Sequence, residues 1–235
     1  MVAAPVSLTS GSDATNASSY ATASIAPSAN KLILAAVSVR KGTATASTPT
    51  LTGCGLTWVQ VATVINSTNV VRLTLFRAMS ASPSSGAVTI DLGGVTHNHC
   101  LWSICEFGSV DTSGTNGSGA VVQSVTKTQN AINSITGTLA AFGSANNATY
   151  GAFNHDNNEA TTHGSGFTDI HDVINSENET LFTERNLAND TTVDASWATS
   201  GNGMVIAVEI KDAPVIIHRR RTLGQSGTRA GSRAA

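Results

Sequence analysis

Short segments in which hydrophobic and polar residues alternate recur along the whole chain. Residues 71–75, Val-Arg-Leu-Thr-Leu, alternate strictly, which predicts a strand with one buried and one solvent-facing side. Residues 32–37 are apolar throughout and predict a central strand that is covered on both faces. Twelve strands are predicted in this way, at residues 20–25, 31–40, 57–64, 71–78, 87–92, 100–107, 134–139, 148–154, 168–173, 179–185, 191–196 and 204–211. Glycine-rich turns separate them and favour antiparallel pairing.

The second part of the chain repeats the first. Val64-Ile65-Asn66-Ser67 returns unchanged as Val173-Ile174-Asn175-Ser176, and Leu75-Phe76 matches Leu181-Phe182. The matched blocks follow one another in the same order, and their spacing changes only between blocks. Such a duplication is typical of a unit that buries its apolar face against its twin.

These patterns predict an all-β fold, namely a jelly-roll-like antiparallel β-sandwich built from two tandem homologous halves, with extended N- and C-terminal arms. The predicted parts are an N-terminal arm (1–18), a duplicated sandwich (19–212, halves about 19–110 and 132–212) and a basic C-terminal tail (213–235). Two separate small sandwiches joined by a flexible crossover at 111–119 are the alternative. We favour one sandwich whose halves intermesh around a pseudo-twofold axis, because a half of about 90 residues has a thin core of its own.

Charge is distributed unevenly along the 235 residues. Through Asp212 there are eight Lys and Arg against fifteen Asp and Glu, whereas the remaining residues hold five Arg and no acid. Neither an apolar run of about 20 residues nor a secretion signal is found, so no membrane association is expected.

Three cysteines leave at least one thiol unpaired. Cys100 and Cys105 lie along one predicted strand, about 16 Å apart and on opposite faces, which argues against a disulfide between them. This cysteine usage suits folding in a reducing cytosol.

Few side chains suggest catalysis or metal binding. His97 and His99 have a chelating spacing but no identifiable third ligand, and the sequence leaves open whether other histidines converge on them. Glu106 and Glu209 hold equivalent repeat positions, so we interpret them as outward-facing strand carboxylates rather than a glycosidase pair. No catalytic, cofactor-binding or metal-binding residue is assigned.

Two features suggest binding. Trp197 is placed just after a strand and is the best candidate for an exposed platform that stacks on a sugar, whereas Trp58 and Trp102 fall in core-type strands. The tail combines apolar and basic residues that suit an anchor on an acidic surface: Val215, Ile216, Ile217, Arg219, Arg220, Arg221, Arg229 and Arg233. A solvated tail without a partner is the equally weighted alternative.

Four segments together resemble a known family. Residues 26–37, the Gly55-Leu56-Thr57-Trp58 turn, residues 72–78 and residues 102–111 occur in an order similar to that of a two-half β-sandwich module of tailed-phage structural proteins and some bacterial surface proteins. The resemblance covers about residues 19–212. It implies a jelly-roll-like domain displayed on a virion, as a head decoration protein or a fibre component, and it supplies no catalytic motif.

We therefore expect a non-enzymatic structural protein of a tailed-phage virion, a capsid decoration protein or another exposed component, assembled in the host cytoplasm. Its expected partners are the major capsid protein or another virion protein and further copies of itself. An acidic body with one small arginine cluster is a poor footprint for nucleic acid. The alternative is a carbohydrate-binding β-sandwich module for host or surface attachment, with a glycan as its partner.

Overall fold

The computed structural model describes residues 1–214, which form strands, turns and loops but no helix. The strands are β1 (Val6–Asp13), β2 (Ser19–Ala21), β3 (Leu32–Arg40), β4 (Thr50–Thr52), β5 (Val59–Ile65), β6 (Val71–Ala78), β7 (Thr89–Asp91), β8 (His99–Phe107), β9 (Val121–Thr138), β10 (Ala148–His155), β11 (Thr162–His163), β12 (Thr168–Asn175), β13 (Glu179–Asn186) and β14 (Thr192–Ile210). Within these residues there is accordingly no helical segment that could span a membrane. The expected all-β, antiparallel, sandwich-like class is confirmed.

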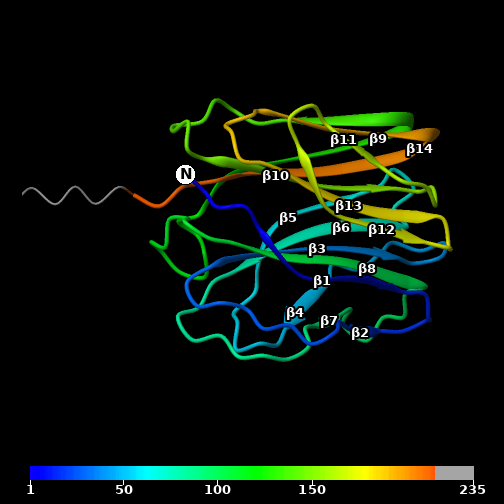
Figure 1. Cartoon of the computed structure of the whole chain (residues 1–235). Helices are drawn as coiled ribbons and strands as arrows, with labels where there is room; N and C mark the ends of the chain where they lie inside the picture. The colour runs from blue at the N-terminus through cyan, green and yellow to red at the C-terminus, as the bar shows by residue number, and fades with distance from the viewer. Residues whose placement is uncertain (215–235) are drawn as a thin grey trace, which may run out of the picture.

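The strands form four layers (Figure 1). A five-stranded sheet, β1-β8-β3-β6-β5, is covered on one face by the small sheet β2-β7-β4. Its other face packs against the sheet of β14, β10, β13 and β12. In the fourth layer the first part of β14 pairs with the end of β9 and with β11. We call residues 1–110 the first half and residues 121–212 the second half.

Strand order in the two halves corresponds. The sheet β1-β8-β3-β6-β5 matches β9-β14-β10-β13-β12 position by position. The register agrees as well, because Leu34 pairs with Cys105 just as Tyr150 pairs with Val208. Contacts between the halves also come in matched pairs: β8 packs on β12 and β13, while β14 packs on β5 and β6.

One of the sequence matches is shifted. Phe76 pairs with Ala35, whereas Phe182 pairs with Phe153, which corresponds to Val37 in the first half. The match of Phe76 with Phe182 is therefore wrong by two residues, and Phe182 corresponds instead to Thr74, which pairs with Val37. Both rings still lie on the outer side of their sheets, away from the other half.

Hydrophobic residues gather in three clusters. One cluster, which includes Leu34, Phe107 and Tyr150, fills the space between the halves, and the Phe107 and Tyr150 rings meet edge to face at 6.2 Å. The other two lie inside the first and the second half. Each half thus has a core of its own in addition to the shared one, so the arrangement combines the two alternatives that the sequence offered.

The predicted N-terminal arm at residues 1–18 is wrong. Residues 6–13 form β1, which pairs along β8 and becomes the edge of the large sheet, and the Val2 side chain is buried. The pairing satisfies backbone groups of β8 that would otherwise lie open at the sheet edge. The short Ser, Thr and Gly side chains of this segment concealed the strand, since they give almost no hydrophobic alternation.

Candidate functional site

Four polar side chains meet in the interior between the two halves. Glu179, at the start of β13, receives hydrogen bonds on both carboxylate oxygens: Ser38 and Asn154 donate to Oε1, the latter from Nδ2 at 2.8 Å, and His99 Nε2 donates to Oε2 at 2.5 Å. All four residues are buried. We call them the inter-half polar cluster. A buried carboxylate needs such partners, because desolvation of an unpaired charge costs several kcal/mol.

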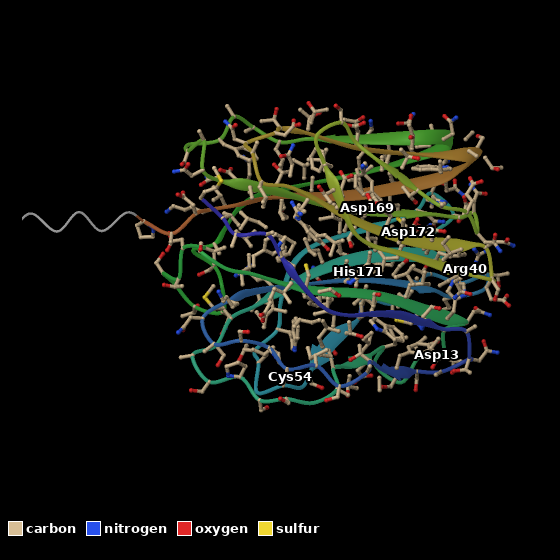
Figure 2. The ribbon with its side chains drawn as sticks, viewed as in Figure 1. Asp13, Arg40, Cys54, Asp169, His171 and Asp172 are labelled. Atoms are coloured by element: carbon tan, nitrogen blue, oxygen red, sulfur yellow. The ribbon has the colours of Figure 1, made fainter. Side chains whose placement is uncertain are left out.

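His99, one member of this cluster, also lines a polar pocket. This junction pocket has a volume of about 380 Å³ and is lined only by polar residues and a glycine: Arg40, Gly42, Thr43, Asn98, His99, Glu177 and Asn178. Three segments build it, namely the end of β3, the start of β8 and the turn between β12 and β13. Arg40 lies at the end of the body opposite the N-terminus (Figure 2). The pocket is thus built from both halves.

Side chains that line the junction pocket are held in place by local hydrogen bonds. Asn98 Oδ1 accepts the backbone N–H of Gly42, and the Asn98 N–H donates to the Arg40 carbonyl at 2.8 Å. Across the pocket the Glu177 N–H donates to Asn175 Oδ1 at 2.9 Å, which fixes the turn. Among residues 1–214, neither the Asn98 Nδ2 group nor the Glu177 carboxylate makes a hydrogen bond to the backbone.

The histidines do not converge. His97 Nε2 accepts the Ser47 N–H at 2.9 Å, and its Nδ1 binds the Val95 carbonyl, so it faces away from His99 and Glu179. Among residues 1–214 no group of three potential metal ligands is found.

A hydroxyl–imidazole chain joins the halves at another place. Ser7 Oγ lies 2.6 Å from His171 Nε2, and His171 Nδ1 lies 2.8 Å from Ser103 Oγ, which in turn contacts Thr183 Oγ1 at 2.9 Å. Burial lowers the pKa of His171, so its neutral form is favoured. A Ser–His pair resembles a nucleophile and its base, but the group that orients the imidazole here is a hydroxyl with no charge to stabilise an imidazolium. We therefore interpret the chain as a structural bridge between β1, β8, β12 and β13.

The expected exposed platform at Trp197 is wrong. Trp197 lies inside β14, only 5% of its surface is exposed, and its ring stacks on His155 with centroids 4.6 Å apart. The strand continues beyond the predicted end at residue 196, which turns the ring into the core of the second half. The described structure thus gives Trp197 a packing role.

Glu106 and Glu209 hold equivalent positions, as expected, but the prediction that they face outward into solvent is wrong. Both are buried. Ser28 donates to Glu106 from its N–H (2.8 Å) and its hydroxyl (2.7 Å), while Asn147 and Gln123 donate to Glu209 at 2.5 and 2.6 Å. Ser28 and Asn147 belong to the loops that precede β3 and β10, whereas Gln123 lies in β9.

A further buried carboxyl, Glu184, was missed by sequence reasoning. Burial, followed by the nearby charges of Asp194, Asp169 and Asp190, raises the pKa of Glu184 to about 8. Its Oε2 accepts the Gly164 N–H at 3.2 Å, and its Oε1 is buried without a partner among the described residues. The sequence signal was its place two residues beyond Phe182, on the same face of the predicted strand 179–185.

The predicted anchor residues, from Val215 to Arg233, lie outside the described residues. Comparisons with family models, with curated proteins and with solved structures found no match for this chain. The junction pocket and the inter-half polar cluster are therefore assessed on their own geometry.

Proposed function

We propose that this protein is a non-enzymatic structural component of a tailed-phage virion, in the role of a capsid decoration protein or another exposed component. In this proposal the chain consists of two homologous jelly-roll-like halves. The strand orders β1-β8-β3-β6 and β2-β7-β4, repeated in the second half, support a jelly roll, because these seven strands alternate between two sheets as in its interleaved order.

One observation carries the assembly role, namely the free edge of β9. This strand runs for 18 residues and pairs with β14 along one side, and its other side pairs with no strand among residues 1–214. Its outer residues are mostly Ser, Thr, Gln and Asn, with Lys127 as the single charge. A long edge of this kind can accept a strand from a neighbouring subunit through backbone hydrogen bonds. Homo-oligomerisation or attachment to a shell protein would use that edge.

The tail supplies a second contact in this proposal. Its five arginines follow a body that carries fifteen acids and eight basic residues. Arginine pairs with carboxylates through two parallel hydrogen bonds, so an acidic surface on a neighbouring subunit or shell protein is the expected target.

Mass spectrometry of particles purified from the source of the gene tests the proposal. A copy number comparable with that of the major shell protein would support decoration, and a few copies per particle would support a tail or fibre position. Absence from the particles would overturn the virion role.

Binding of the purified full chain to particles that lack it tests the tail. Deletion of residues 215–235 should weaken binding, and replacement of Arg219, Arg220 and Arg221 by Ala should do so in part. Added salt should have the same effect, because exposed charge pairs are screened beyond about 8–10 Å. Equal binding by the deleted and full chains would exclude the tail as an anchor.

A further inference from the structure

We propose that the junction pocket binds a sugar that carries a carboxylate group, such as a uronic acid. This inference does not rest on the virion role, since the pocket would bind the same ligand in any setting.

At the equivalent position in the second half, two polar residues bind each other instead of lining a pocket. Arg40 pairs with His99 in the first half, and continuation of the register by one residue places Asp156, just after β10, opposite Asn202 of β14. There Asp156 accepts the Asn202 N–H at 2.6 Å and its Nδ2 group at 2.5 Å, so the polar groups satisfy one another. In a duplicated body, residues needed only for folding can be shared by both halves. His99 serves the fold by binding Glu179, so the difference that indicates a role beyond folding is the one at Arg40.

Arg40 offers an unused positive charge. The ion pairs found among residues 1–214 do not include it, although its side chain is half-buried at the pocket. A planar guanidinium binds a carboxylate through two parallel hydrogen bonds. Arg40 is accordingly the group that would hold the ligand's carboxylate.

Hydroxyl groups match the remaining lining. The Glu177 carboxylate can only accept hydrogen bonds, the Asn98 amide can still donate from Nδ2, and Asn178 can do both. His99 is fixed by Glu179 through Nε2, and its Nδ1 is buried without a partner among the described residues. Sugar hydroxyls both donate and accept, so they suit this mixture of groups.

Other ligand classes fit less well. An apolar ligand would displace water from polar side chains and offer them no hydrogen bonds in return, which costs free energy. A phosphate would bring its double charge close to the Glu177 carboxylate. The volume of about 380 Å³ lies near the lower end of the usual range for small-molecule sites and has room for a sugar ring.

Titration of the full chain with galacturonic acid, glucuronic acid and galactose, followed by ligand-observed NMR, tests the inference. At least one uronic acid should bind with a millimolar Kd, about tenfold more tightly than galactose, because a hydrogen-bonded charge pair is lost with the neutral sugar. R40Q should weaken uronic acid binding about tenfold or more, and E177Q, which replaces a carboxylate acceptor by an amide, should weaken galactose binding. R185Q, which removes another half-exposed arginine, should change neither.

Thermal melting shows whether each variant folds. R40Q and E177Q should leave the melting temperature unchanged. No binding by either uronic acid at about 10 mM would overturn the inference. So would equal binding of galactose and the uronic acids, or binding that R40Q leaves intact. Glycine bound more tightly than the sugars would assign the pocket to amino-acid zwitterions and would likewise overturn it.

Discussion

Ser38 and Asn154 hold equivalent positions in the two halves and are hydrogen-bonded to each other, with Asn154 Nδ2 3.0 Å from Ser38 Oγ. In a twofold interface, a residue that touches its own equivalent lies at the axis. The approximate axis between the halves therefore passes close to this bond. Symmetry fails immediately beside it, because Glu179 corresponds to the apolar Val71. Only one carboxylate sits at the axis, and both Ser38 and Asn154 bind it.

The bond at the axis should be measurable by a double-mutant cycle. Ser38→Ala and Asn154→Ala should each lower the free energy of unfolding by about 1 kcal/mol or more, since each leaves buried groups without a partner. The double variant should cost less than the sum, with a coupling of about 0.5 kcal/mol or more. Urea unfolding of the four proteins gives these values. Strict additivity would show that the two residues act independently.

Glu179 should matter much more for stability than its neighbour Glu177. In Glu179→Gln, an amide N–H₂ group replaces one of the acceptors that Ser38, Asn154 and His99 need, so we expect a loss of about 1–3 kcal/mol. Glu177→Gln, in the exposed turn two residues earlier, should change stability by less than about 0.5 kcal/mol. Urea unfolding curves for the two variants provide the comparison. Similar losses would mean that the cluster does not stabilise the fold.

Local sequence patterns predicted the strands that carry large apolar residues. Residues 71–78 form β6 with the expected bounds, because Leu73, Leu75 and neighbouring residues leave no ambiguity about the buried faces. The prediction missed β1, β4 and β11, which are short or rich in Ser, Thr and Gly and owe their existence to pairing with distant strands. Such pairing depends on tertiary context rather than on local propensity.

The candidate site could not be predicted from the sequence in the same way. His99, Arg40 and Glu177 lie far apart in the chain and belong to both halves, so only the packing of one half on the other brings them together. The sequence analysis did single out His99, but only as a possible metal ligand paired with His97. Burial decided the outcome for Trp197, because the continuation of β14 through residues 197–200 turned an expected surface residue into a core residue.

The three thiols should be inert in the folded protein. Cys54, Cys100 and Cys105 are free and buried, and Cys100 and Cys105 lie in different core clusters, on opposite faces of β8 as expected. Burial also raises the pKa of each thiol, which further reduces the reactive thiolate. A thiol reagent at pH 7 should label none of them in the native state and all three after unfolding without a reductant. Rapid native labelling, or two thiols missing after unfolding, would contradict the prediction.

Glu184 should make the protein less stable as the pH rises through neutrality. Its pKa is raised from 4.5 to about 8 in the folded state, so between these values the folded protein holds a proton that the unfolded chain releases. The stability that comes from the neutral carboxyl is complete below pH 4.5 and is lost as the pH approaches and passes 8.

The window from pH 6.5 to 8 isolates this group from His155. Burial lowers the pKa of His155 to about 4, so His155 reduces stability only as the pH falls from 6.5 towards 4. Above pH 6.5, Glu184 should cost as much as about 1.4 kcal/mol per pH unit, or about 2 kcal/mol by pH 8. Urea unfolding at several pH values should show this decline in the wild type, and Glu184→Gln should flatten it because an amide does not titrate. Glu177→Gln, which changes an exposed carboxyl, should keep the wild-type slope. A decline that survives in Glu184→Gln would assign the pH dependence to another group.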